Sequence, residues 1–205
     1  IGAGLLLNGE LYRGNGAAGE FGHVFVEDNK LHCASCGKQG CLEATAGLQA
    51  IVKDARNPSD RTYIQDSKEA PITPEMMADV IIAARDKSDT RSRDALERAG
   101  KHIGKAIGNC LINIYNPSMI LLDGGSVRPS KGDAVYRNDF LLKSLRQSAQ
   151  DSSMAVNWAG TQILDGTLGD DAVALGAVAT VIDNDPELNM PKGDAQNSIR
   201  AIGAI

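Results

Sequence analysis

Positive charge is scarce in this 205-residue chain, and so are long apolar runs. The sequence has 21 Lys and Arg against 26 Asp and Glu, which gives a net charge of -5 and a pI near 5.2. This balance argues against a phosphate-binding or nucleic-acid-binding surface, and no DNA-reading motif is evident. No apolar run reaches the roughly 20 residues of a membrane-spanning helix, and no charged and then apolar leader opens the sequence. We therefore expect a cytoplasmic protein without a membrane partner.

Cysteine is scarce as well, but three of the four cysteines lie close together, shortly after a histidine. Four nitrogen and sulfur ligands satisfy tetrahedral zinc, and a Cys-x2-Cys pair can hold one ion from a tight turn. The candidate ligands are His23, Cys33, Cys36 and Cys41. Because four protein ligands leave no open position for an activated water, we predict a structural zinc in a loop over residues 23–41. A reducing cytoplasm suits such thiolates.

A redox pair or a disulfide between Cys33 and Cys36 is the alternative to the metal site. No βαβ pattern surrounds the pair in the manner of thioredoxin. This alternative also leaves Cys41 and His23 without a role. The metal hypothesis accounts for all four residues and is preferred.

The residues around this cluster resemble the ROK family, which groups sugar-responsive transcriptional repressors with sugar kinases such as bacterial glucokinases. Residues 19–23 read Gly-Glu-Phe-Gly-His, and residues 40–43 read Gly-Cys-Leu-Glu. One departure is that the family usually shows Cys-x-Cys, whereas Cys33 and Cys36 are separated by two residues. The resemblance implies that Glu20, His23 and Glu43 bind a sugar. Glu43 also fits a simpler role, because a carboxylate in the first turn of a helix complements the helix dipole.

Helices alternating with short apolar strands predict an α/β fold. The resemblance implies the C-terminal domain of an actin-like, ribonuclease H-like sugar-kinase fold over residues 1–182, followed by a poorly ordered tail over residues 183–205. The start reads as a hairpin entered in mid-fold, so we expect a piece of a longer protein. The resemblance implies that this protein is a homodimer or homotetramer. The missing part would carry the phosphate loop and catalytic aspartate of a kinase, or the DNA-binding helix-turn-helix of a repressor. We name no catalytic residue here and expect this piece alone to be inactive.

The predicted elements follow from hydrophobic periodicity and turn residues. We expect strands at 1–12, around an Asn8-Gly9 turn, and at 24–26, 119–122 and 156–163. We expect helices at 42–56, 73–86, 91–115, 140–149 and 171–182, with a surface excursion at 58–71. In the longest helix, Gly100, Gly104 and Gly108 would allow a close neighbouring helix, Cys110 would be a core thiol, and His102 would be solvent-exposed.

The segment after the 119–122 strand bears on nucleotide binding. The family pattern there ends in three glycines, of which Gly124 and Gly125 are present and would bind ATP, with Mg²⁺, only in a kinase. Asp123 replaces the first glycine and would repel a phosphate. Val173 replaces the glycine that ends a second family pattern, Leu-Gly-x-Asp-Ala-Gly. We therefore favour a regulator with a sugar effector over an ATP-dependent hexose kinase; a purely structural zinc domain is a third possibility.

Overall fold

The computed structural model describes residues 1–27, 31–57, 72–128, 137–169 and 171–184. The chain divides into two units, residues 1–170 and 171–205. The described part of the second unit is one helix, α8 (Asp171–Asn184). Most of the predicted tail, residues 185–205, and the predicted surface excursion at 58–71 lie outside the described residues. Among the helices in the described ranges, none combines the length and hydrophobicity that a membrane crossing requires.

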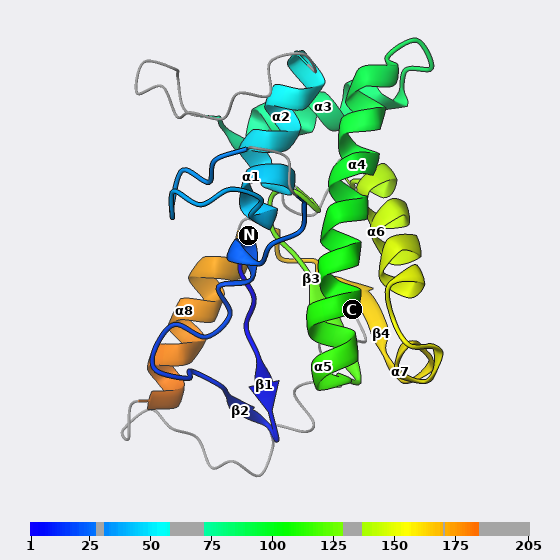
Figure 1. Cartoon of the computed structure of the whole chain (residues 1–205). Helices are drawn as coiled ribbons and strands as arrows, with labels where there is room; N and C mark the ends of the chain where they lie inside the picture. The colour runs from blue at the N-terminus through cyan, green and yellow to red at the C-terminus, as the bar shows by residue number, and fades with distance from the viewer. Residues whose placement is uncertain (28–30, 58–71, 129–136, 170, 185–205) are drawn as a thin grey trace. The chain divides into compact units, whose positions relative to one another are not determined.

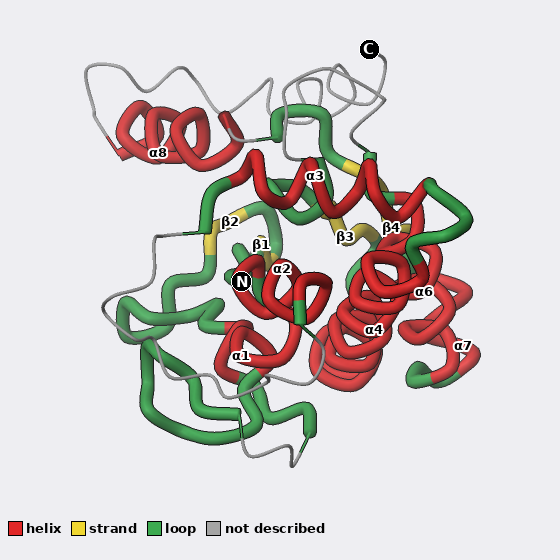
Figure 2. The backbone as a smooth tube through the Cα atoms, turned by 90° about the horizontal axis from the view of Figure 1, so that it is seen from above, coloured by secondary structure: helices red, strands yellow, loops and turns green. Residues whose placement is uncertain are grey.

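The core of the first unit is built around a long helical run. It consists of α4 (Thr90–Ala106), a π-helical segment η2 (Ile107–Ile112) and α5 (Asn113–Tyr115), which confirms the helix predicted over 91–115. The helices α1 (Leu42–Ala46), α2 (Leu48–Arg56), α3 (Pro74–Arg85) and α6 (Asp139–Asp151) pack against α4. Figures 1 and 2 both show α4 and α6 side by side. Large buried side chains include Leu96 on α4 and Leu141 and Leu145 on α6.

Small residues set the distance between α4 and α6. A β-carbon added at Gly100 or Gly104 would overlap a carbonyl oxygen of α6, and at Gly108 it would lie 2.7 Å from Ala149 O. The predicted close approach at these glycines is confirmed. Cys110 is half-buried against the same core, as expected, and burial raises the pKa of its thiol.

The strands form two separate pairs within the described residues. The antiparallel hairpin of β1 (Leu6–Leu7) and β2 (Glu10–Leu11) turns at Asn8 and Gly9, whose φ angles of 56° and 81° suit a tight hairpin turn. Strands β3 (Met119–Leu122) and β4 (Gln162–Asp165) are parallel, in a register that pairs Met119 with Gln162. Parallel pairing brings the carboxyl ends of β3 and β4 to one edge.

Several sequence expectations were wrong in detail. Residues 24–26 form no strand, because residues 21–23 turn into a short 3-10 helix, η1 (Phe21–His23), and Phe25 makes only an isolated bridge to Cys41. The region 156–163 is mostly helix α7 (Ala155–Gly160), since a short apolar alternation does not distinguish a six-residue helix from a strand. The helix predicted over 42–56 is interrupted at Gly47, which is extended (φ -68°, ψ 168°).

The predicted exposure of His102 was also wrong. Its side chain is only 20% exposed, and its Nε2 lies 3.6 Å from Glu27 Oε2. Glu27 lies a few residues after η1, so the contact joins the segment after η1 to α4. Periodicity along one helix does not reveal a partner from another segment.

Candidate functional site

The loop over residues 23–41 is closed by backbone pairing at its base. Val26 N donates to Gly40 O at 2.9 Å, and Leu42 N donates to Val24 O at 2.9 Å. Gly40 has a φ of +78°, and a β-carbon there would overlap the carbonyl oxygen of Glu27. A glycine at position 40 therefore lets the two ends approach, and this pairing brings residues 23 and 41 together.

A tight turn presents the middle of the loop. Gly37 N donates to Cys33 O at 2.8 Å, and Cys33 N donates to Lys38 O at 2.8 Å. Gly37 adopts a left-handed φ of +71°, which a side chain would disfavour. The turn returns Cys36 to the side of Cys33.

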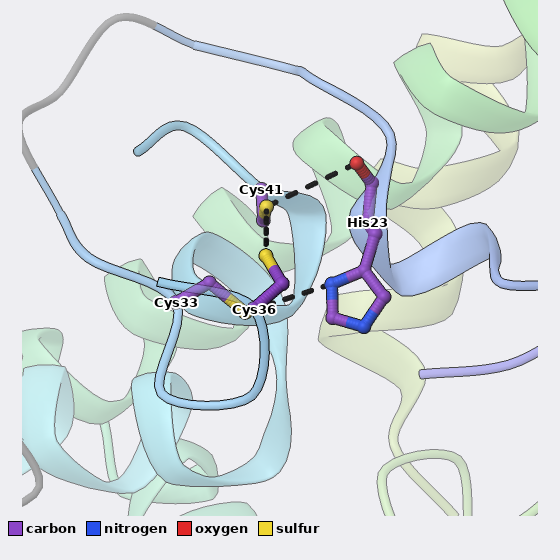
Figure 3. A group of neighbouring side chains, drawn as sticks. All are labelled: His23, Cys33, Cys36 and Cys41. Atoms are coloured by element: carbon purple, nitrogen blue, oxygen red, sulfur yellow. Dashed lines mark hydrogen bonds between the residues drawn. The ribbon is translucent and has the colours of Figure 1, made fainter. Parts of the chain in front are cut away.

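The four predicted metal ligands lie together (Figure 3). One ligand atom from each of His23, Cys33, Cys36 and Cys41 falls within 4.8 Å of every other. The Cys36 and Cys41 sulfurs are 3.5 Å apart, and Cys33 Sγ lies 3.6 Å from His23 Nδ1. Two sulfurs on a tetrahedral zinc are about 3.8 Å apart, since each Zn–S bond is about 2.3 Å. The donor set and its spacing therefore fit a zinc ion.

The three thiols differ in their surroundings. Cys33 and Cys41 are buried, whereas Cys36 is exposed. Burial, with a smaller contribution from the hydrogen bond to Cys36, raises the pKa of Cys41 to about 12. A hydrogen bond from the Lys38 backbone is the main cause that lowers the pKa of Cys36. Because thiolates are the ligating form, a metal bound here must displace the proton of Cys41.

His23 lies between the cysteine cluster and a carboxylate. Its Nδ1 faces Cys33, while its Nε2 lies 3.7 Å from Glu20 Oε2. The His23 side chain is 31% exposed and that of Glu20 is 68% exposed, so a ligand from solvent can reach both side chains. The two residues are three apart across η1, which places them on neighbouring positions of one turn.

Glu43 lies in the first turn of α1, as predicted, and α1 packs against η1. Its carboxylate contacts the backbone nitrogen of Ile1. A β-carbon at Gly22 would lie 3.2 Å from Glu43 Oε2, and one at Gly47 would overlap Glu43 Oε1. Glu43 is thus beside the residue that precedes His23, and the three predicted sugar-binding residues come from two adjacent elements.

The predicted nucleotide-binding residues Gly124 and Gly125 are elsewhere, in the turn after β3. There the Asp123 carboxylate accepts hydrogen bonds from the backbone nitrogens of Gly124 at 2.8 Å, Gly169 at 2.9 Å and Leu168 at 3.2 Å. The sequence predicts that this side chain repels a phosphate, but it does not predict that the side chain accepts hydrogen bonds from two loops. A short acidic side chain before glycines is a known turn signal, but its partners at 168 and 169 are not readable from that signal.

A second carboxylate at the same edge was also missed. Asp165, the last residue of β4, accepts from Arg137 Nη2 at 2.6 Å and Nε at 3.0 Å, and also from Arg146. Burial by itself raises the pKa of Asp165, but the hydrogen bonds from Arg137 and Arg146 outweigh it and bring the pKa below its ordinary value. These bonds connect β4 to α6, through Arg146, and to Arg137, which lies two residues before α6.

Comparisons with known proteins agree on one family. The sequence model described as the ROK family matches residues 1–184. The chain is 28% identical to the xylose repressor of Bacillus subtilis over 90% of this chain and 42% of the repressor. It is 29% identical to a glucokinase of Halalkalibacterium halodurans over 95% of this chain and 56% of the enzyme. The chain thus spans about half the length of these curated relatives.

A solved structure supports the fold. A ROK family glucokinase from Streptomyces griseus, in complex with glucose and AMPPNP, matches with a TM-score of 0.65 and 25% identity, over 87% of this chain and 56% of that chain. The match, together with the family assignment, supports an actin-like sugar-kinase α/β fold.

Proposed function

The chain belongs to the ROK family, and on this premise we propose that it is the sugar-binding effector domain of a transcriptional regulator of carbohydrate metabolism. DNA binding would belong to another part of the full-length protein, which would act as a homodimer or homotetramer. The full-length relatives include both repressors and glucokinases, so family membership alone does not distinguish the two activities.

The observation that best supports sugar binding is the position of His23 between the cysteine cluster and the Glu20 carboxylate. Its Nδ1 faces the cysteine cluster, and its Nε2 faces Glu20. A zinc held by His23, Cys33, Cys36 and Cys41 would fix the ring orientation and the tautomer, which leaves Nε2 to donate a hydrogen bond to a sugar oxygen. The zinc would supply no chemistry of its own beyond shaping the loop.

Glu20 and Glu43 would complete the sugar site. Ionised carboxylates accept two or more hydrogen bonds and suit the paired hydroxyl groups of a hexose. Glu20 lies on the same turn as His23, and Glu43 lies beside Gly22. The three side chains therefore offer two acceptors and one oriented donor on neighbouring elements.

The choice of a regulator over a kinase is supported by Asp123. A glycine at this place in the family pattern would leave the backbone bare for a phosphate, whereas this chain places a carboxylate on the local backbone N–H groups. Val173, which replaces the glycine of a second family pattern, also favours a regulator.

The alternative is a sugar kinase, in which Gly124 and Gly125 would hold ATP with Mg²⁺. The glucokinase relative and the neighbour solved with glucose and AMPPNP favour this second candidate.

Calorimetry with the full-length protein and a panel of hexoses and N-acetylhexosamines tests sugar binding. Each of Glu20→Ala and Glu43→Ala removes a charged acceptor whose hydrogen bonds contribute about 1.5–3 kcal/mol, so affinity should fall at least about tenfold. Asp79→Ala, which removes an exposed carboxylate on α3, is the matched control and should bind normally. Unchanged sugar affinity in both glutamate variants would contradict the proposed sugar site.

Assays of the same protein separate the two classes. A regulator should bind operator DNA in a way that the bound sugar changes, and it should transfer no phosphate from ATP. Phosphorylation of any hexose by the intact protein would overturn the choice of regulator and leave the sugar site standing.

A further inference from the structure

Within the metal cluster, Cys36 and Cys41 form an oxidisable pair (Figure 3). Their sulfurs are 3.5 Å apart, whereas the Cys33 sulfur lies beside the His23 ring, 3.6 Å from Nδ1. Disulfide sulfurs are about 2.05 Å apart, so those of Cys36 and Cys41 need to approach each other by only about 1.5 Å. Cys36 is also exposed, while Cys33 and Cys41 are buried. An oxidant from solvent can therefore reach one member of the pair, and the other member is close enough to complete a disulfide.

The backbone around the pair allows this small movement. Cys41 is held at the start of α1, where its carbonyl oxygen accepts from Thr45 N at 3.2 Å and from Thr45 Oγ1 at 3.0 Å. Cys36 instead lies within a turn whose residues 34–39 are all exposed. The turn can thus bring Cys36 onto Cys41 without displacing α1.

We propose that this pair makes the metal cluster a peroxide-sensitive switch, in which peroxide joins Cys36 to Cys41 and zinc is released. The Cys36 sulfur attacks one peroxide oxygen, the O–O bond breaks, and water and a sulfenic acid form. The Cys41 sulfur then attacks the Cys36 sulfur, the S–O bond breaks, and the oxygen leaves as a second water. The two thiolates lose two electrons in total, and one hydrogen peroxide takes up these electrons and two protons. Only His23 and Cys33 remain as ligands, which is half the ligand set of a structural zinc.

Oxidation would also weaken sugar binding, and this part of the inference rests on the proposed function. His23 is both a predicted metal ligand and a predicted sugar-binding residue, and Cys41 comes two residues before Glu43. Without the metal the His23 ring is free to rotate, and the new disulfide pulls on the residue that precedes α1. Sugar affinity should therefore fall when peroxide acts and return when a thiol reductant and zinc are added.

Hydrogen peroxide treatment of the zinc-loaded full-length protein provides the test. A chromophoric chelator should detect the release of about one zinc per chain, and peptide mapping should find Cys36 joined to Cys41. The sugar affinity, measured by calorimetry after peroxide is removed, should be at least about tenfold lower and should recover with reductant and zinc. Zinc that stays bound, or zinc release with a disulfide that contains Cys33, would overturn the switch.

The zinc and disulfide measurements involve no sugar, so failure of this inference is distinguishable from failure of the proposed function. If zinc is released and the Cys36–Cys41 disulfide forms while sugar affinity is unchanged, control of the sugar site by peroxide is refuted. A protein that binds no sugar before treatment contradicts the proposed function instead.

Two matched variants test whether Cys36 is the residue that peroxide attacks. Cys33→His and Cys36→His each replace one thiolate with an imidazole, which also ligates zinc. At the same peroxide concentration, Cys36→His should release zinc at least about tenfold more slowly than the wild type, whereas Cys33→His should stay within about twofold of it. Equal rates in the two variants would overturn the assignment of Cys36. Disulfide mapping in the wild type does not depend on how either variant folds.

Discussion

At the scale of single residues, Cys36 differs from the other members of the metal cluster because it is exposed while Cys33 and Cys41 are buried. An oxidant from solvent therefore reaches Cys36 first. Its sulfur lies 3.5 Å from that of Cys41, which is close enough for Cys41 to complete a disulfide with little movement. The structure thus favours a disulfide between Cys36 and Cys41, whereas the Cys-x2-Cys motif in the sequence suggests one between Cys33 and Cys36.

We predict that peroxide treatment of the metal-free protein yields a Cys36–Cys41 disulfide. Peroxide is reduced to water as the two thiols lose their protons and join. Peptide mapping by mass spectrometry identifies the pair, and Cys110→Ser, which removes the thiol outside the cluster, is the control. A predominant Cys33–Cys36 disulfide would contradict this prediction.

At the scale of elements, the contact between α4 and α6 depends on the missing side chain of Gly104. An alanine in a helix interior is usually better than glycine by about 0.5–1 kcal/mol. Here its β-carbon would overlap Leu145 O and lie 2.9 Å from Ala149 N, and backbone atoms cannot rotate aside. Overpacking typically costs about 1–3 kcal/mol, so the loss should exceed the gain.

Gly104→Ala is therefore predicted to lower the free energy of unfolding by roughly 1–2 kcal/mol. Chemical denaturation provides the measurement, and Lys105→Ala, at an exposed position of the same helix, is the control. Unchanged or increased stability in Gly104→Ala would show that α4 and α6 are farther apart than described.

The link between β4 and α6 should depend on pH. The pKa of Asp165 lies below its ordinary value near 3.8 in the folded protein, so its ionised form is favoured by folding. The stabilisation is fully present above the unfolded pKa and is lost as the pH falls through the lower, folded value. Asp165→Asn should thus lower the free energy of unfolding by about 2 kcal/mol at neutral pH. The difference in this free energy between the variant and the wild type should shrink below about pH 4. Denaturation at a series of pH values, with the exposed Asp79→Asn as control, checks this; a difference that persists well below the ordinary pKa would refute it.

At the scale of the whole molecule, the sequence predicted what local signals determine. Ligand spacing predicted the cluster of His23 and the three cysteines, and the 3.6-residue period predicted the helical run through α4 and η2. The local signals did not predict the hydrogen bonds of Asp123 to residues 168 and 169 or the contact of His102 with Glu27, because these join segments far apart in the chain. The zinc and the sugar remain predictions, whereas the family and the proximity of the ligands are established.

If one metal ion holds the sugar site in place, removal of the metal should weaken sugar binding, and a sugar titration of the metal-free protein measures this effect. The purified full-length protein should contain about one zinc per chain. A chelator should lower both the melting temperature and the sugar affinity, the latter at least about tenfold, and added zinc should restore both. If metal-free protein binds the sugar as tightly as the zinc-loaded protein, no metal orients His23 for sugar binding.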